Sequence, residues 1–416
     1  MLWVISELYY PEENSSSRYF TQIAEGLAEV APVSVICCQP GYHQRGIRAP
    51  WSEKRHGVRI ERCRATTFDK NVLPSRIVNL VTSTVALFSR ALWRLNSGDV
   101  ALVGTNPPTL AGAVALACRV KGAQCVLRMD DVYPEAVFNA GFMRPGGIPA
   151  RALQRVARLL YERVNSIVVV GRDMQELVDA RLGGKSSKVT VIPNWGDVQA
   201  VAVQPKGENR LLQELGLAEK FVIGYAGNVG PLQGIENLFA TMVRLRDQRR
   251  LHFLVVGSGR KAEWLRKSVI VSGLQNVTML GHRPRSEQSS FLNACDIGFI
   301  SLVRGMAGVG VPSRLYNMLA AGKPIIAAIE DNAETARVVR EERIGWVVPP
   351  DSPQELGAAI VEASSNPAIL AQMGVRARAV AEAKYSLSQG VEAYRVLFRD
   401  VLKWGVDCEL QPHGSM

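Results

Sequence analysis

The sequence predicts an α/β fold with two doubly wound, Rossmann-like domains. The first observation is a βαβ opening, with a strand at Leu2–Ser6, a helix from about Arg18 to Glu29 and a strand at Val33–Cys38. The second is a near-identical βα start at Phe221–Gly227. The third is the length of 416 residues, which is too many for a single hydrophobic core.

The remainder of the first half continues the alternation of strands and helices. Its strands are short apolar runs, as expected where both faces of a parallel sheet are covered. The expected strands are Gly57–Arg62, Asp99–Gly104, Gln124–Met129, Ser166–Val170 and Val189–Ile192, and the expected helices are Pro108–Val120 and Arg172–Leu182. A polar stretch, Gln199–Asn209, then reads as the linker between domains.

The second half repeats this pattern. Its further strands are Leu251–Val256, Val277–Leu280, Asp296–Ser301 and Pro324–Ala328, and its helices include Thr335–Arg340, Ser352–Ser365, Pro367–Lys384 and Ser388 to about Lys403.

The GxGxxA pattern from Gly257 is weak evidence for a dinucleotide. The acidic residue that would follow the next strand is absent, which disfavours NAD.

The stretch from Gly310 to Ala328 reads as loop, helix, tight turn and strand. Pro312 and Ser313 are helix-start signals, and Ser313 is expected to be the N-cap. Small residues let a ligand approach the backbone, and free N–H groups at a helix start attract anions. The preceding loop carries the glycines Gly305, Gly308 and Gly310. A docked phosphate and an ordinary βα turn are equally compatible with this pattern.

Two carboxylates, Asp131 and Glu135, follow the strand Gln124–Met129 at its carboxyl end. Doubly wound sheets bind ligands at this edge, so the pair suggests acid/base chemistry or the binding of sugar hydroxyls. A solvated loop followed by an acid in the first turn of a helix would give the same pattern. Both interpretations stay open on the residues alone.

The net charge is +11, and residues 1–200 contribute +7 of it. Such a surface attracts anionic lipid or polyphosphate substrates, while the scarcity of aromatics among the basic runs argues against nucleic acid. The basic residues gather in two clusters, Arg45, Arg48, Lys54, Arg55, Arg59, Arg62 and Arg64, and Arg144, Arg151, Arg155, Arg158 and Arg163. Seven unpatterned cysteines suggest reduced thiols and a cytoplasmic protein.

The segment Arg76–Leu95 carries an apolar stripe at steps of three and four residues. Arg90 and Arg94 fall within it, so the segment is not expected to span a membrane. It is either a core helix of the first domain or a helix that docks on a membrane surface. The core interpretation is favoured because most amphipathic stripes are buried, although one helix can serve both roles.

The stretch around Gly310 resembles the nucleotide-sugar site of retaining GT-B glycosyltransferases of family 4. It is most similar to the branch of O-antigen and capsule amino-sugar transferases, which carries a G-x-P-S-K-x-Y-E motif. Arg314 stands at the Lys of that motif, and Asn317 stands at the second Glu of the family's E-x7-E pair. The segment from Asp131 to Glu135 resembles the D-x-W-P-E of that branch, with Tyr133 in place of Trp.

The resemblance implies a GT-B fold, with two Rossmann-like domains facing each other across a cleft. It implies a first domain over 1–200, a nucleotide-sugar domain over 201–385 and a helix over 386–406 that crosses back. The implied reaction is retaining transfer of a sugar, such as a deoxy or N-acetylamino sugar, in cell-surface polysaccharide synthesis. The donor would be a nucleoside diphosphate sugar, UDP rather than GDP, and the acceptor a polyprenyl-diphosphate-linked glycan or an oligosaccharide.

The resemblance also assigns residues. Asp131 and Glu135 would be catalytic, with Asp131 organising the acceptor, and Lys261 is preferred over Arg260 at the diphosphate. The nucleotide-sugar contacts would be Ser16, Gly227, Asn228, Lys261, Gly310, Pro312, Ser313, Arg314, Tyr316, Asn317 and Glu334. No metal or cofactor is expected, because no Asp-x-Asp stands at a donor-site strand end. The enzyme would work at the inner face of the plasma membrane. A GT-B epimerase and an inactive nucleotide-binding module stay open as alternatives, the latter because of Asn317.

Overall fold

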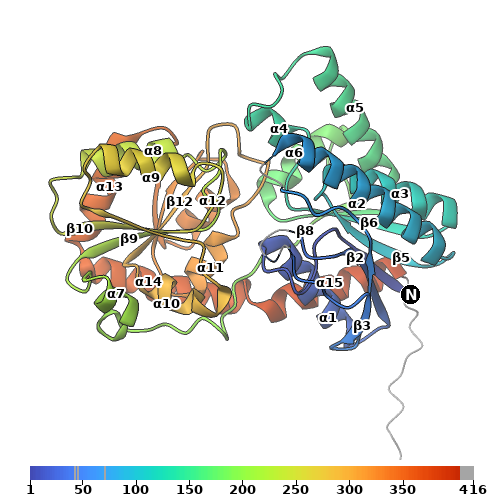
Figure 1. The fold of residues 1–416 in the computed structure, drawn as a ribbon, viewed down its shortest axis with the longest axis horizontal. Helices are drawn as coiled ribbons and strands as arrows, with labels where there is room; N and C mark the ends of the chain where they lie inside the picture. The colour runs from blue at the N-terminus through green and yellow to red at the C-terminus, as the bar shows by residue number, and fades with distance from the viewer. Residues whose placement is uncertain (42–43, 45, 70–71, 403–416) are drawn as a thin grey trace, which may run out of the picture.

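The computed structural model describes residues 1–41, 44, 46–69 and 72–402. Two α/β domains lie side by side (Figure 1). An eight-stranded sheet with the order β3-β4-β2-β1-β5-β6-β7-β8 forms the first, and a six-stranded sheet with the order β11-β10-β9-β12-β13-β14 forms the second. All strand pairs are parallel except β3 with β4. The prediction of two doubly wound sheets is confirmed.

The first sheet contains the strands β1 (Leu2–Ile5), β2 (Val33–Cys38), β3 (Ser52–Arg55), β4 (Val58–Cys63), β5 (Val100–Gly104), β6 (Gln124–Met129), β7 (Ser166–Val169) and β8 (Val189–Val191). The central strand β1 pairs with β2 and with β5. Nearly every residue of these central strands is buried, because helices cover both faces of the sheet.

The helices of the first domain form two layers. On one face lie α1 (Ser15–Ala28) and the last helix α15 (Leu387–Leu402), which share a core with β1 and β2. The other face carries α2 (Leu73–Arg94), α3 (Pro108–Lys121), α5 (Ile148–Arg163) and α6 (Arg172–Leu182), with the short α4 (Glu135–Asn139) at the edge of the cleft. In Figure 1 this second layer lies above the sheet, and α5 stands near its top.

The second domain has the same layered plan. Its strands are β9 (Phe221–Ala226), β10 (Leu251–Val256), β11 (Val277–Gly281), β12 (Ile297–Ser301), β13 (Ile325–Ala328) and β14 (Gly345–Val348). The helices α8 (Ile235–Arg244), α9 (Ala262–Val271) and α13 (Pro353–Ser365) share one core, and α11 (Arg314–Ala320), α12 (Glu334–Glu341) and α14 (Pro367–Lys384) contribute to another. Short helices α7 (Arg210–Glu214) and α10 (Gln288–Asn293) lie near the linker.

The structure differs from the sequence expectations in several places. Helix α1 begins three residues earlier than expected, because the Asn14 side chain caps it by accepting from the Ser17 N–H at 2.8 Å. The antiparallel edge strand β3 and the helix α5 were not expected. Arg45, and the part of the expected last segment beyond residue 402, lie outside the described residues.

Helix α2 belongs to the core of the first domain along one part of its apolar stripe and exposes apolar side chains along another. Leu87, Ala91 and Leu95 are fully buried against the sheet. Near the start of the same helix, Ile77, Val81 and Val85 are exposed. Within the described ranges, no helix has the length and apolarity needed to cross a bilayer.

Helix α15 returns from the second domain and packs on α1 of the first (Figure 1). The contact is close on both sides, because each partner presents a glycine. A Cβ at Gly390 would lie 2.2 Å from the ring of Trp195, and one at Gly26 would lie 2.5 Å from Val391. Trp195 itself is buried between Tyr19 and Tyr394.

We therefore expect Gly390→Ala to destabilise the protein by about 1–3 kcal/mol, because the new methyl group overpacks the Trp195 contact. Gly112→Ala in α3 is the matched control: nothing lies within 4 Å of its Cβ, so it should be neutral or stabilising. Chemical denaturation of both variants measures this. Equal stability of the two variants would show that α15 is not tightly docked.

Candidate active site

A cleft with a volume of about 700 Å³ lies between the domains, at the carboxyl ends of the parallel strands of both sheets. Such edges are where open α/β sheets bind ligands. Among the residues that the structure describes, five guanidinium groups and three carboxylates line it. The lining cations are Arg76, Arg260, Arg283, Arg285 and Arg314, and the lining acids are Glu7, Glu13 and Asp131. The cleft therefore suits an anionic ligand.

The glycine-rich loop before α11 reaches across to the first domain. Gly305 and Gly308 adopt positive φ values of 88° and 76°, which glycine tolerates best. The Val132 N–H donates to the Val309 carbonyl at 2.7 Å, and Asp131 forms an isolated antiparallel bridge with Gly310. A Cβ at Gly310 would lie 2.8 Å from Oδ1 of Asp131, so only glycine fits here without a shift.

Asp131 lines the cleft on the side of the first domain. Burial raises the pKa of this carboxyl group to about 7, and the adjacent charge of Asp130 adds to the shift. A carboxyl group with such a pKa exchanges its proton near neutral pH. It is therefore suited to accept a proton or to hold a hydroxyl group.

Helix α11 presents two polar side chains to the cleft, and both have atoms without a protein partner. Arg314 is 8% exposed and lies over the ring of Tyr225 at 4.6 Å, yet its Nη1 is buried and makes no hydrogen bond. One turn further on, Oδ1 of Asn317 is also buried without a donor. Both residues line the cleft. Buried polar atoms normally have a hydrogen-bond partner, and these two are placed to receive one from a ligand in the cleft.

Serine hydroxyls from the two domains meet near the start of α11. Ser313 occupies the N-cap position, as expected, but its side chain makes no capping bond. Its hydroxyl instead lies 3.1 Å from that of Ser15 across the cleft. Ser16 lines the cleft and donates to Oδ2 of Asp130 at 3.1 Å. Pro312 precedes the helix and is half-buried.

The first βα turn of the second domain supplies Gly227 and Asn228, which are exposed and line the cleft. Gly227 has a φ of 143° and lies against the guanidinium of Arg314. The structure thus brings Ser16, Asp131, Gly227, Asn228, Arg314 and Asn317 around one space.

Seven expected site residues do not line the cleft: Gly310, Pro312 and Ser313 belong to the segment just before α11, and the other four lie elsewhere. Lys261 forms an ion pair with Glu236, and the neighbouring Arg260 lines the cleft in its place. Tyr316 is fully buried and packs edge-on against Tyr385 at 5.1 Å. Glu135 does not line the cleft but pairs with Arg181, which also donates to the Tyr133 carbonyl; we therefore assign it no catalytic role.

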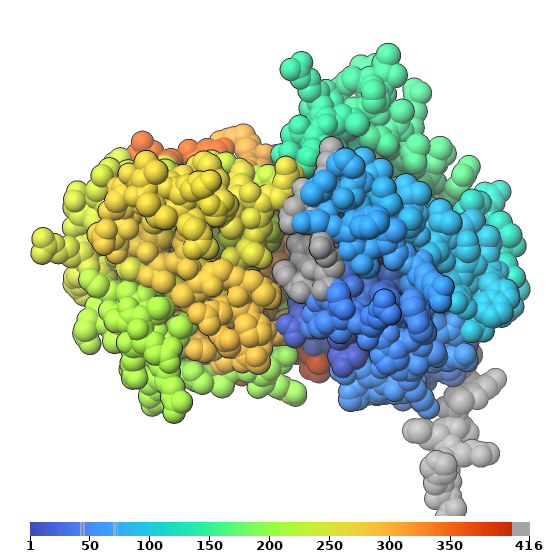
Figure 2. Space-filling model, viewed as in Figure 1, coloured from blue at the N-terminus to red at the C-terminus, as the bar shows by residue number. Residues whose placement is uncertain are grey.

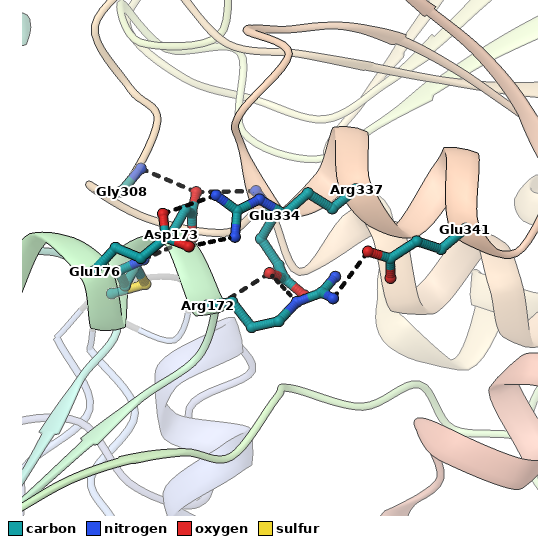
Figure 3. Close-up of polar contacts among 8 residues, drawn as sticks. Arg172, Asp173, Glu176, Gly308, Glu334, Arg337 and Glu341 are labelled. Carbon is teal, nitrogen blue, oxygen red and sulfur yellow. Dashed lines mark hydrogen bonds and ion pairs between the residues drawn. The ribbon is translucent and has the colours of Figure 1, made fainter. Parts of the chain in front are cut away.

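Glu334 is the fourth, and it belongs to a set of polar contacts between the domains (Figure 3). Its carboxylate accepts from the Arg172 backbone N–H at 3.0 Å and from Arg172 Nε at 2.9 Å. Its own backbone N–H and that of Gly308 both donate to Oδ2 of Asp173 at 2.9 Å. A pair between Arg337 and Glu176 extends the set. We call these contacts the interdomain latch.

Arg128 is a site-supporting residue that the sequence reasoning missed. It is fully buried in β6, and its guanidinium donates to Oδ1 of Asp130 at 2.8 Å and to Oδ1 of Asn194 at 2.6 Å. It also donates to the hydroxyl of Tyr394 in α15. The group thus ties the cleft edge to the crossover helix. A charged residue within an otherwise apolar strand was the signal that could have revealed it.

The described residues contain no group of three His, Cys, Asp or Glu side chains that could hold a metal ion. Positive charge at the cleft comes from arginine side chains.

Two family models match the chain in succession. Residues 16–195 match the glycosyl transferase 4-like domain, and residues 220–366 match the domain described as glycosyl transferases group 1. The chain is 29% identical over 412 residues to a protein from Pseudomonas aeruginosa named probable glycosyltransferase WbjE, covering 96% of this chain and 98% of that protein.

A second relative, from Escherichia coli K12, bears the name putative colanic acid biosynthesis glycosyl transferase WcaI. It is 26% identical over 371 residues, covering 85% of this chain and 90% of the relative. The crystal structure of HepE from Anabaena in complex with UDP-glucose superimposes with a TM-score of 0.74 at 17% identity, covering 96% of this chain and all of that one. The predicted GT-B fold is confirmed.

The raised pKa of Asp131 predicts how stability depends on pH. The folded state holds the protonated form up to about pH 7, whereas the unfolded chain ionises near 3.8. Wild type should therefore lose stability relative to Asp131→Asn between about pH 4 and pH 7, and the difference should then stay constant. Thermal unfolding of both proteins across this range measures it. A difference that is the same at every pH would show that the carboxyl group titrates normally.

Proposed function

The chain is a glycosyltransferase that joins a glycosyl transferase 4-like domain to a group 1 domain, and on this premise we propose that it moves a sugar from a UDP-sugar to a lipid-linked or oligosaccharide acceptor. The product belongs to cell-surface polysaccharide synthesis, and the reaction retains the anomeric configuration. This assignment of acceptor and stereochemistry draws on the family resemblance. The enzyme acts at the inner face of the plasma membrane.

One observation carries the proposal: Nη1 of Arg314 and Oδ1 of Asn317 are both buried, unpartnered and on the cleft side of the same helix. A donor diphosphate accepts charge-assisted hydrogen bonds, and a ribose supplies hydroxyl donors. A nucleoside diphosphate therefore satisfies both atoms at once. Helix α11 has only seven residues, so its N–H groups contribute less here than the guanidinium does.

The other residues of the cleft take complementary roles. Arg260 approaches the diphosphate from the turn after β10, and the open backbone at Gly227 and Asn228 lets the phosphates come close. Charge on the departing nucleoside diphosphate is stabilised by these fixed cations. Asp131 faces them from the first domain and orients the acceptor hydroxyl. The donor phosphate assists attack on the same face of the sugar.

Nucleotide release tests the function. The protein is incubated with UDP-sugars and with GDP-sugars, each with and without bacterial membrane lipid extract, and free nucleotide is measured. Release that requires the extract is the result we expect. Equal release in both arms would favour an epimerase that frees UDP. No release, with nucleotide-induced thermal stabilisation, would favour a binding module.

Donor affinity tests the residues. Arg314→Ala should weaken UDP binding by about 1.5–3 kcal/mol, which is roughly 10- to 150-fold, because it removes a charge-assisted contact. Arg260→Ala should act in the same direction. Lys261→Ala is the matched neighbour and should change affinity less, since Lys261 is paired with Glu236. Titration calorimetry measures all three, and unchanged affinity in Arg314→Ala would remove this residue from the site.

A further inference from the structure

Two guanidinium groups, one from each domain, lie close together beside the cleft. Arg18 stands near the start of α1 in the first domain, and Arg285 begins the short 3-10 helix η2 (Arg285–Glu287) in the second. The positive charge of Arg18 lowers the pKa of Arg285, so the two side chains are near enough to repel each other. In Figure 2 the dark blue start of the chain meets the orange part of the second domain along this seam.

Arg18 is almost enclosed by protein, yet part of its guanidinium group has no hydrogen-bond partner. Its side chain is only 9% exposed. Within the described part of the chain, neither Nε nor Nη2 makes a hydrogen bond. These two atoms form one edge of the guanidinium plane, and the parallel N–H groups of that edge bind a carboxylate or a phosphate in bidentate fashion. The free edge of Arg18 therefore has the geometry that an oxyanion requires.

Arg285 has a similar deficit. Its Nη2 is buried and has no hydrogen-bond partner among the described residues. Burial lowers the pKa of Arg285 to about 10, with a contribution from the charge of Arg18, and burial lowers the pKa of Arg18 as well. Three buried donor atoms of two neighbouring cations thus lack an acceptor, which is unusual in a folded protein.

The nearby carboxylates do not supply the missing acceptor. Oδ2 of Asp197 lies 3.6 Å from Nη2 of Arg18, which gives an ion pair but exceeds the length of a hydrogen bond. The other oxygen of Asp197 accepts from the Ala200 N–H at 3.0 Å. Glu13 also attracts Arg285, but Glu13 is exposed to solvent. The place for a well-bonded anion between the two arginines is therefore left to a ligand.

The arginine pair lies next to the cleft. Arg285 lines the cleft, and so does Ser15, which stands about one helical turn before Arg18. The hydroxyl of Ser15 lies 3.1 Å from that of Ser313, the neighbour of Arg314 in the sequence. An anion held by Arg18 and Arg285 would therefore lie near the proposed diphosphate contact without using the same guanidinium group.

We propose that Arg18 and Arg285 form a second oxyanion site, which binds a phosphate or carboxylate group other than the donor diphosphate. Arg18 donates two parallel hydrogen bonds to this group, and Arg285 donates one from the other domain. The bound charge offsets the repulsion between the two cations and joins the domains beside the cleft. The start of a helix also favours an anion, and the first turn of α1 contains no acid.

The anion is part of a substrate, and this step rests on the proposed function. Two sources have the same chemistry. One is a donor whose sugar is acidic and carries a carboxylate, and the other is a second molecule that carries a phosphate. The site itself does not rest on the proposed function, because its unpartnered atoms belong to Arg18 and Arg285 and not to the contacts assigned to the donor.

Stabilisation by inorganic phosphate tests the site. Thermal unfolding of the full chain is followed as phosphate is added at constant ionic strength, with and without saturating UDP. Wild type should gain stability in both series. Arg18→Gln and Arg285→Gln should each weaken phosphate binding about 10- to 150-fold, because each removes a charge-assisted contact. Arg18→Lys keeps the charge without the two parallel donors, so it should lose most of the effect as well.

Two controls separate this site from general attraction by the cleft. Arg283→Gln lies two positions from Arg285, and Arg283 is paired with Glu287 at 3.2 Å. This variant should respond to phosphate as wild type does, and so should Arg314→Ala in the presence of UDP. An equal loss in Arg283→Gln would overturn the proposal. So would a phosphate effect that saturating UDP abolishes, because the phosphate would then occupy the donor site.

A choice of donor sugars identifies the source of the anion. UDP-glucuronate that binds more tightly than UDP-glucose, with the preference lost in Arg18→Gln, would support the site and assign the anion to the donor. Equal affinities, with phosphate bound beside UDP, would support the site and assign the anion to a second molecule. Phosphate binding through Arg18 in a protein that binds no UDP would remove the donor site alone. UDP binding with neither a phosphate effect nor a sugar preference would remove the second oxyanion site alone.

Discussion

One carboxylate, that of Asp173, joins the two domains beside the cleft through hydrogen bonds to two backbone N–H groups. Its Oδ2 accepts from the backbone N–H groups of Gly308 and Glu334 in the other domain. Burial raises the pKa of Asp173, and these N–H donors oppose that rise by stabilising the charged form. Because Gly308 belongs to the glycine loop, the same bond fixes Gly310 against Asp131. The latch is therefore the contact on which the geometry of the site depends.

The cleft itself is built from polar groups that the protein leaves unsatisfied. Arg314 is buried and Asn317 is half-buried, and each has a buried hydrogen-bonding atom without a partner. Asp131 is half-buried, and desolvation raises the pKa of its carboxyl group. Each of these arrangements lowers the stability of the empty protein. A nucleoside diphosphate would supply hydrogen bonds to the unpartnered atoms of α11. Binding would therefore restore the stability that the empty protein loses at these atoms. We propose that these unpartnered atoms make the site selective for an anionic, hydroxyl-bearing ligand.

The sequence predicted the two sheets well, because continuous apolar strands and glycine turns are local signals. The sequence predicted the site residues less well, because neighbouring positions point their side chains in different directions. Lys261 and Arg260 are adjacent, yet only Arg260 faces the cleft, and the partner of Lys261 is Glu236, twenty-five positions away. Glu135 lies near the carboxyl end of β6, as expected, but its carboxylate pairs with Arg181 of α6. Helix α5 was missed as a helix because its arginines read as a basic cluster.

We propose that the unpartnered atoms of α11 receive the donor. A crystal structure of the complex with UDP tests it most directly. We expect a phosphate oxygen within hydrogen-bonding distance of Arg314 and a ribose hydroxyl donating to Oδ1 of Asn317, with the latch between Asp173 and the glycine loop intact. UDP bound elsewhere, with Arg314 and Asn317 still unpartnered, would contradict it.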